Sequence, residues 1–292
     1  MITLIWLALA LLSAFLTAAV SLLEKKTLMR EHSLQFSLLC ALLNFFLSIA
    51  LVYFVDFSAL DLGLVLIIYG ASWLNVIANW FILKGIRHEE LSSITPLMNL
   101  SPLVLLLLAA FFLGEKLTAL QGGGALLMVI GVYLLETAVY GSPSTLLKFD
   151  KTKYVWIAMV GIFLLAFCAL ADKIVLNALT AISYILLIQV FIAVNYLILF
   201  IALERDKFSD ILPAARRDWK KLGAISVLTI ANRLALASAI SITYVSLAIT
   251  VKRLSTLFST IAGGALFNEK HLALKVAACG LMVAGVYFVI AQ

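Results

Sequence analysis

Ten long apolar segments constrain the fold of this chain more than any other feature. Each has about 20 residues, the length that a helix needs to cross the roughly 30 Å hydrocarbon core of a bilayer. Lipid leaves backbone polar groups no partner outside a helix or a closed barrel, and the alternation typical of barrel strands is absent. The sequence therefore predicts an all-α integral membrane protein with ten transmembrane helices. The expected spans are residues 2–23, 33–55, 62–84, 91–113, 118–139, 154–176, 180–203, 222–242, 245–267 and 272–291.

Composition excludes several function classes. The chain is 64% hydrophobic and 12% charged, whereas soluble domains are about half apolar and a quarter charged. Its net charge of +6 comes mostly from short loops, where basic residues set orientation and contact anionic lipid, so no nucleic-acid partner is expected. The three cysteines have no metal-ligand spacing and no span contains a histidine. We therefore expect no metal, no cofactor and no enzymatic activity.

An internal repeat organises the ten segments. A shift of 154 residues aligns residues 115–133 with 269–287, and ten of the nineteen positions are identical. Both stretches begin with Glu-Lys, interpreted as a topological anchor at a helix end, and both finish with Gly-Val-Tyr. Two units of five helices must be inverted relative to each other, which is typical of transporters. The predicted units are a first repeat over 1–140, a linker over 141–153 and a second repeat over 154–292.

The distribution of basic residues predicts orientation. Sixteen lysines and arginines lie in or beside the connections after the odd-numbered spans, and two after the even-numbered spans. Because cytoplasmic loops are enriched in these residues, the odd connections should be cytoplasmic. Both termini of this multi-pass protein are then non-cytoplasmic, in a plasma or inner membrane.

The repeat pattern resembles the drug/metabolite transporter superfamily, and within it the EamA-domain family. Residues 91–135 carry the resemblance in LSSITPLMNLSPLVLLLLAAFFLGEKLTALQGGGALLMVIGVYLL. It implies a ten-helix transporter, although many relatives keep both termini in the cytoplasm. The Lys252-Arg253 pair is also similar to a pair that grips phosphate in the ninth helix of sugar-phosphate translocators. Lys173 matches a further substrate-binding lysine late in the sixth helix of those proteins.

Three cations lie away from the ends of the predicted spans, at positions not assigned to a connection. Lys252 and Arg253 begin about 10 Å into span 245–267, and Arg233 lies about 16 Å into its span. Charges at such depth usually face a cavity or a partner; the alternatives are snorkelling of the pair and pairing of Arg233 with Asp172. The carboxylates in the spans all lie near span ends. Cations without a central anion predict an anionic substrate, and exchange or facilitated diffusion rather than proton coupling.

Other polar residues are candidates for orienting a substrate or bending a helix. Asn75 and Asn79 share a helix face beside Trp80, although hydrogen bonds between helices and simple packing explain these residues equally well. Further candidates for substrate contact are Asn232 and Thr95. Pro96 and Pro102 predict kinks in the fourth span.

The sequence thus predicts a secondary transporter that moves a small anionic or zwitterionic metabolite by alternating access. Its cavity would be lined by the third, fourth, eighth and ninth spans, with Lys173 near the mouth of the sixth. A lipid flippase of the same fold and a non-transporting sensor or assembly protein are the alternatives. The expected partners are the metabolite and the lipid bilayer, and a homodimer is left open.

Overall fold

The structure is a computed structural model that describes residues 2–28, 33–55, 60–88, 101–116, 118–140, 153–204, 208–255, 257–258 and 272–290. Every regular element within these ranges is a helix, and they contain no strand. Six of the helices are long and apolar enough to cross a membrane. The described part of the chain is therefore all-helical, as predicted, and provides multiple segments able to span a bilayer.

Within the described residues, ten α-helices and one 3₁₀ helix follow one another, and each α-helix overlaps one predicted span. They are α1 (Ile2–Leu28), α2 (Ser33–Ile49), η1 (Ala50–Phe54), α3 (Leu62–His88), α5 (Ser101–Phe112), α6 (Ala119–Tyr140), α8 (Lys153–Leu176), α9 (Ala181–Glu204), α10 (Phe208–Ile242), α11 (Val245–Lys252) and α13 (Leu272–Ile290).

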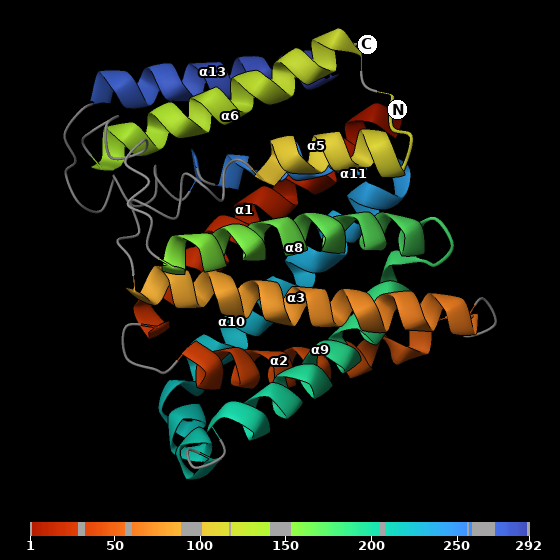
Figure 1. Cartoon of the computed structure of the whole chain (residues 1–292), viewed down its shortest axis with the longest axis vertical. Coiled ribbons are helices and arrows are strands. Elements are labelled where there is room, and N and C mark those ends of the chain that lie inside the picture. The colour runs from red at the N-terminus through yellow and green to blue at the C-terminus, as the bar shows by residue number, and fades with distance from the viewer. Residues whose placement is uncertain are drawn as a thin grey trace.

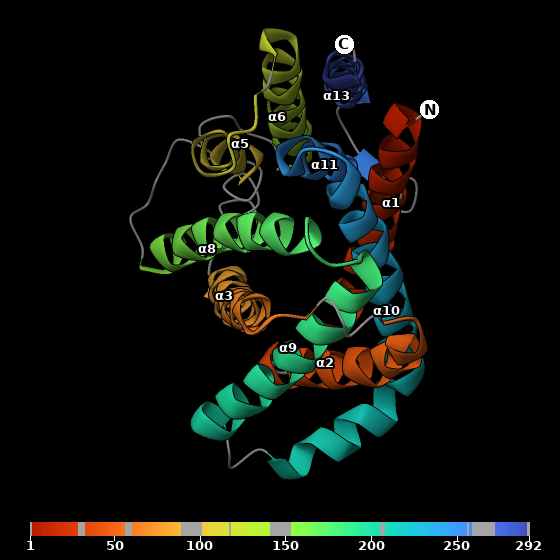
Figure 2. The ribbon, with the colours of Figure 1, turned by 90° about the vertical axis from the view of Figure 1, so that its right-hand side faces the viewer.

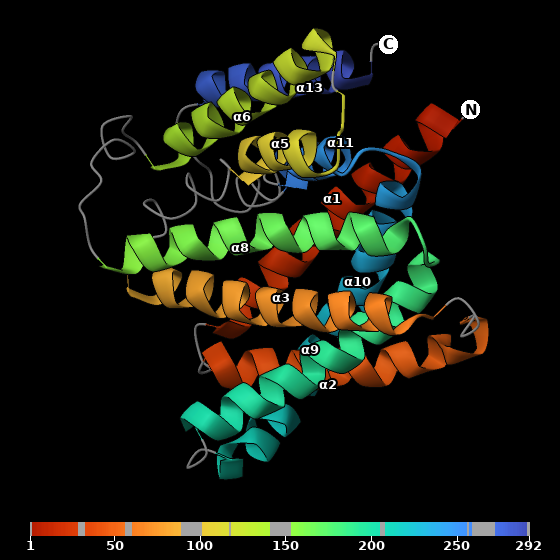
Figure 3. The same cartoon turned by 45° about the vertical axis from the view of Figure 1, so that its right-hand side comes forward.

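The helices pack in pairs that join the two halves of the sequence. The most extensive contacts are those of α6 with α13, α3 with α8, α1 with α10, and α2 with α9. The α6–α13 pair lies at the end of the molecule that carries both termini (Figure 1). Viewed from the side, α3 and α8 face α1 and α10 across the bundle (Figure 2). Helices α5 and α11 lie between the α6–α13 pair and the remaining helices (Figure 3).

Helices α6 and α13 approach each other closely through glycine. A Cβ atom at Gly131 would lie 2.6 Å from Met282 Cγ, and one at Gly285 would lie 2.5 Å from Met128 Cγ. The contact is reciprocal, because each helix places a methionine against a glycine of the other. Between membrane helices, association depends on such close van der Waals packing, since lipid tails are as apolar as the side chains.

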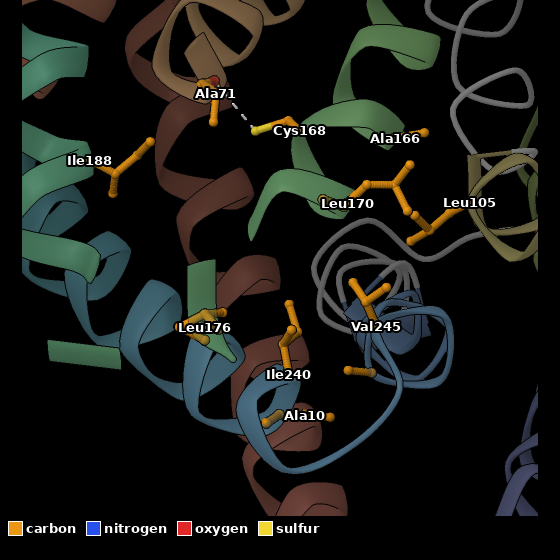
Figure 4. Packing of buried hydrophobic residues seen from close by; sticks show 14 of the residues in the cluster. Ala10, Ala71, Leu105, Ala166, Cys168, Leu170, Leu176, Ile188, Ile240 and Val245 are labelled. Atoms are coloured by element: carbon orange, nitrogen blue, oxygen red, sulfur yellow. Dashed lines mark hydrogen bonds between the residues drawn. The ribbon is translucent and has the colours of Figure 1, made fainter. Parts of the chain in front are cut away.

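The main core cluster joins helices from both halves of the chain. Leu105 of α5, Leu170 of α8 and Val245 at the start of α11 belong to it (Figure 4). Cys168 also belongs to it, and its thiol donates a hydrogen bond to the carbonyl oxygen of Ala71, at 3.6 Å, across the α3–α8 contact. This packing fixes where α11 begins relative to α5 and α8.

The ninth predicted span is interrupted after Lys252. The ninth span was expected to be one continuous helix, but α11 ends at Lys252. The backbone N–H of Arg253 bonds to the Thr250 carbonyl at 3.0 Å, a tightened turn, before Leu254 and Ser255 resume helical geometry. A cation in the last turn is favourable because the carbonyl end of a helix carries partial negative charge. The basic pair therefore lies at a tightened turn, after which Leu254 and Ser255 continue in helical geometry.

Of the two prolines expected to kink the fourth span, only Pro102 lies within the described residues. Pro96 and Thr95 lie outside the described residues. Pro102 is the second described residue of α5, and the residues before Ser101 lie outside the described ranges. In α10 the backbone kinks at Asp218, which has non-helical dihedral angles. This kink separates the start of α10 from the part that contains Arg233.

Candidate functional site

A half-buried carboxylate interacts with the predicted cations. Asp172, on α8, is half-buried. Its Oδ1 accepts a hydrogen bond from the hydroxyl of Tyr184 and lies 3.8 Å from the thiol of Cys168, whose one proton is shared with the carbonyl oxygen of Ala71. Tyr184 and Cys168 are themselves 5% and 4% exposed. Two buried donors from α9 and α8 therefore fix this carboxylate inside the bundle.

The cations of two further helices surround Asp172. Arg233 on α10 and Lys252 on α11 both interact electrostatically with Asp172, and Lys252 also interacts with Arg233 and Arg253. No direct ion pair joins Asp172 to either cation within the part of the chain that the structure describes. We call Asp172, Arg233 and Lys252 the central charge cluster. Its members interact electrostatically, and no ion pair joins them among the described residues.

This arrangement corrects the expectation that no carboxylate lies at the depth of the cations. Asp172 is four residues before the end of α8, about 6 Å along the axis. Lys252 is seven residues after the start of α11, about 10 Å along its axis. The end of α8 and the turn before α11 are neighbours, because Lys173 donates to the carbonyl of Thr243. A carboxylate near the end of α8 therefore interacts electrostatically with a cation of α11. The expectation of exchange or facilitated diffusion rather than proton coupling stays a prediction.

The predicted asparagines divide between two environments. Asn75 of α3 donates to the thiol of Cys168 at 3.9 Å, which connects it with Asp172. Asn79 donates to the carbonyl and to the side-chain oxygen of Asn75, at 2.8 and 3.1 Å. Trp80 is half-buried, and the ammonium of Lys84 lies 5.1 Å from its ring centroid. Asn75 thus borders the central charge cluster, whereas Asn79 and Trp80 follow one turn away along α3.

Asn232 directly precedes Arg233 on α10, and its side chain contacts α1. Its Oδ1 accepts hydrogen bonds from Ser13 at 2.6 Å and from Thr17 at 3.2 Å, both on α1. These bonds cross the α1–α10 contact. Asn232 therefore fixes the rotation of α10 about its axis, and with it the direction of the neighbouring Arg233.

Lys173 points away from the central charge cluster, although it follows Asp172 directly. Its ammonium donates to the carbonyls of Ile240 and Thr243 at 2.7 and 2.8 Å. The first carbonyl lies in the last turn of α10 and the second directly after it, where helix ends leave carbonyl acceptors unpaired. In this structure Lys173 thus binds backbone, in contrast to the substrate-binding role that the resemblance implies.

Glu115 was interpreted as an anchor at a helix end, and the structure gives it a specific contact. Its side chain is 7% exposed and accepts hydrogen bonds from the backbone N–H groups of Val245 and Ser246, at 2.8 and 3.4 Å, and from the Ser246 hydroxyl. A carboxylate at the first N–H groups of a helix is favoured by the helix dipole. The sequence did not predict this contact, because the partners of Glu115 lie far away along the chain. It also did not predict the contact between Tyr184 and Asp172, because a turn separates the two residues. The repeated Glu-Lys pair was the available signal.

One pocket of about 340 Å³ lies at this end of the bundle. Its lining includes Glu115, Lys173, Ser241, Thr243 and Tyr244. These residues come from the ends of α5, α8 and α10 and from the turn before α11. All of those connections follow even-numbered predicted spans.

Comparison with known proteins supports a transporter. Residues 4–137 match the family described as EamA-like transporter family, which nearly coincides with the predicted first repeat. The match supports the predicted kinship with the drug/metabolite transporter superfamily. No curated protein matches the sequence.

Solved structures support the fold. Twenty-eight chains of solved structures match. One of them, described only as a crystal structure of a protein, superposes with a TM-score of 0.76 over 97% of this chain and 95% of its own. The two sequences are 15% identical, so this likeness concerns the fold alone. The family match and the apolar helices together support a multi-pass membrane transporter.

Proposed function

We propose that this protein is a secondary transporter that binds a small anionic or zwitterionic metabolite at the central charge cluster. The observation that carries the proposal is the convergence of Arg233, Lys252 and Asp172 from three helices without a direct ion pair among the described residues. Unneutralised charges inside a membrane bundle are costly and mark ion or substrate sites.

The chemistry of the cluster favours a substrate with acidic groups. A guanidinium offers a planar fork of donors that matches a carboxylate or phosphate, and an ammonium adds a point charge. Asp172 supplies the opposite charge, which suits the ammonium group of a zwitterion. Arg233 and Lys252 would hold the acidic group, with Arg253 beside Lys252, and Asn75 would border the site through Cys168. Thr95, Asn79 and Trp80 remain candidates for contact with the rest of the substrate.

Movement between two inverted repeats would carry the substrate by alternating access. The reciprocal contacts of Gly131 with Met282 and Gly285 with Met128 support such a relation, because these positions are equivalent under the 154-residue shift. The central charge cluster would lie between the repeats, as transporter sites commonly do. Asp172, Arg233 and Lys252 all belong to the second repeat, and Asn75 belongs to the first.

Thermal-shift screening of the purified protein tests the proposal, because a ligand that binds the native fold raises its apparent stability. The panel contains small phosphates, carboxylates, amino-acid-type zwitterions, amines and neutral metabolites. We expect an acidic or zwitterionic compound to stabilise the wild type, and to lose this effect in Arg233→Ala and Lys252→Ala. Arg216→Ala is the matched control, since Arg216 is an exposed arginine of the same helix.

Flux of the stabilising compound into proteoliposomes then separates a carrier from a binding protein. Stabilisation by amines or neutral compounds alone, equal in all variants, would exclude the central charge cluster as an anion site. Binding without flux would favour the sensor alternative.

A further inference from the structure

Two charged side chains hold the turn between α10 and α11 from opposite sides. Lys173 donates to the carbonyls of Ile240 and Thr243, before and within the turn. Glu115 accepts from the N–H groups of Val245 and Ser246, directly after it. The cation therefore binds the carbonyl end of α10 and the anion binds the amide end of α11, which are the favourable combinations for helix dipoles.

The two side chains come from different predicted repeats. Glu115 follows α5 in the first, and Lys173 lies near the end of α8 in the second. They also interact electrostatically with each other. The turn is thus fixed across the boundary between the two halves that alternating access would separate. A relative movement of the halves at this end must break or remake these hydrogen bonds.

The helices joined by this turn carry the cations of the central charge cluster. Lys252 ends α11, which spans only eight residues from Val245, about 12 Å along the axis. Arg233 lies nine residues before the end of α10. A change at the turn would therefore shift both cations, because a helix of this length moves as a rigid body.

We propose that Glu115 and Lys173 form a latch that closes this end of the bundle, with the pocket of about 340 Å³ as the vestibule outside it. The role of this latch depends on the proposed transport function. Release of either side chain frees the turn and connects the vestibule with the central charge cluster. By the distribution of basic residues, the vestibule would open on the non-cytoplasmic side.

Cysteine labelling tests the latch without a substrate. Ser241 lines the vestibule, and Ala237 lies one turn deeper on the same face of α10, where it is 3% exposed. Single cysteines are introduced at these positions after replacement of Cys40, Cys168 and Cys279. The protein is reconstituted in nanodiscs, so that a membrane-impermeant maleimide reaches both faces. Labelling rates are compared between the latched chain and the variants Glu115→Gln and Lys173→Met.

We expect the cysteine at position 241 to react at similar rates in every background. The cysteine at position 237 should react slowly in the latched protein, and at least tenfold faster once either latch side chain is changed. Ser246→Ala is a milder variant that removes only the hydroxyl contact with Glu115, and it should give an intermediate rate. It keeps the test usable if the charge variants fail to yield monodisperse protein.

Unchanged reactivity at position 237 in all three variants would overturn the latch. Because labelling needs no ligand, its outcome is independent of the thermal-shift panel. A failed panel with accelerated labelling would contradict the anion site and leave the latch standing. Stabilisation by an acidic compound together with unchanged labelling would support the anion site and contradict the latch.

Discussion

The phenolic hydroxyl of Tyr184 donates a hydrogen bond to the carboxylate of Asp172, twelve residues earlier in the chain. A short turn joins α8 to α9, and Thr180 begins α9 by accepting a hydrogen bond from the backbone of Ser183 at 3.2 Å. The first turn of α9 thus folds back onto α8 and places the tyrosine beside the carboxylate. This contact explains how a charge near the end of an apolar segment becomes part of the central charge cluster.

Loss of that hydroxyl should destabilise the protein. A hydrogen bond to a charged group contributes about 1.5–3 kcal/mol, and because Asp172 is half-buried we expect Tyr184→Phe to cost about 1–2 kcal/mol. Chemical unfolding in detergent measures the change. In the double variant with Asp172→Ala, the two effects should not add, because both substitutions remove the same contact. Full additivity would show that the hydrogen bond does not contribute.

Asp172 should also determine whether a pH gradient drives transport. Asp172 is the one carboxylate of the central charge cluster, and carboxylates inside membrane proteins commonly serve as proton relays. If uptake into proteoliposomes is accelerated by an imposed pH gradient, Asp172→Asn should abolish that acceleration and retain exchange of labelled for unlabelled substrate. Acceleration that persists in Asp172→Asn would place the coupling group at another residue.

The α6–α13 contact should not tolerate a methyl group. A Cβ atom at Gly285 would lie 2.7 Å from the carbonyl oxygen of Gly124 and 2.5 Å from Met128 Cγ. Overpacking of this kind costs about 1–3 kcal/mol, so Gly285→Ala should lower the melting temperature. Gly280→Ala in the same helix is the control, because nothing lies within 4 Å of its added Cβ. Equal melting temperatures of the two variants would contradict the close approach.

Two buried amides should respond in opposite directions to substitution by leucine. Asn195 donates to Ser72 Oγ at 2.8 Å between α9 and α3, a bond worth about 0.6 kcal/mol in a membrane. Asn195→Leu should therefore destabilise the protein. Both polar atoms of the Gln189 side chain are buried and have no hydrogen-bond partner among the described residues. Gln189→Leu should be neutral or stabilising, because it removes unpaired polar atoms, and thermal unfolding compares the two.

Orientation can be measured directly. The distribution of lysine and arginine predicts that both termini are non-cytoplasmic. An epitope at the N-terminus should be accessible to antibody on intact cells or spheroplasts, whereas one inserted between α9 and α10 should require permeabilisation. The reverse pattern would place the vestibule and the latch on the cytoplasmic side without changing their geometry.

The apolar segments by themselves determined that the described chain is helical, because lipid offers the backbone no other way to pair its polar groups. The same segments predicted where the helices lie, and the lysine and arginine residues inside them drew attention to Arg233 and Lys252. These are local properties, and a sequence records them directly.

Only the tertiary structure decided which charges meet. Asp172 and Lys173 are neighbours in sequence, yet the first contacts Tyr184 and the second the end of α10. Glu115 contacts a helix that begins 130 residues later. Neighbouring residues on a helix point about 100° apart, and the packing of other helices sets what each direction meets. Distance along the chain and depth from a helix end carry no information about that packing, and for this reason the sequence alone missed the carboxylate of the site and the hydrogen bonds of the latch.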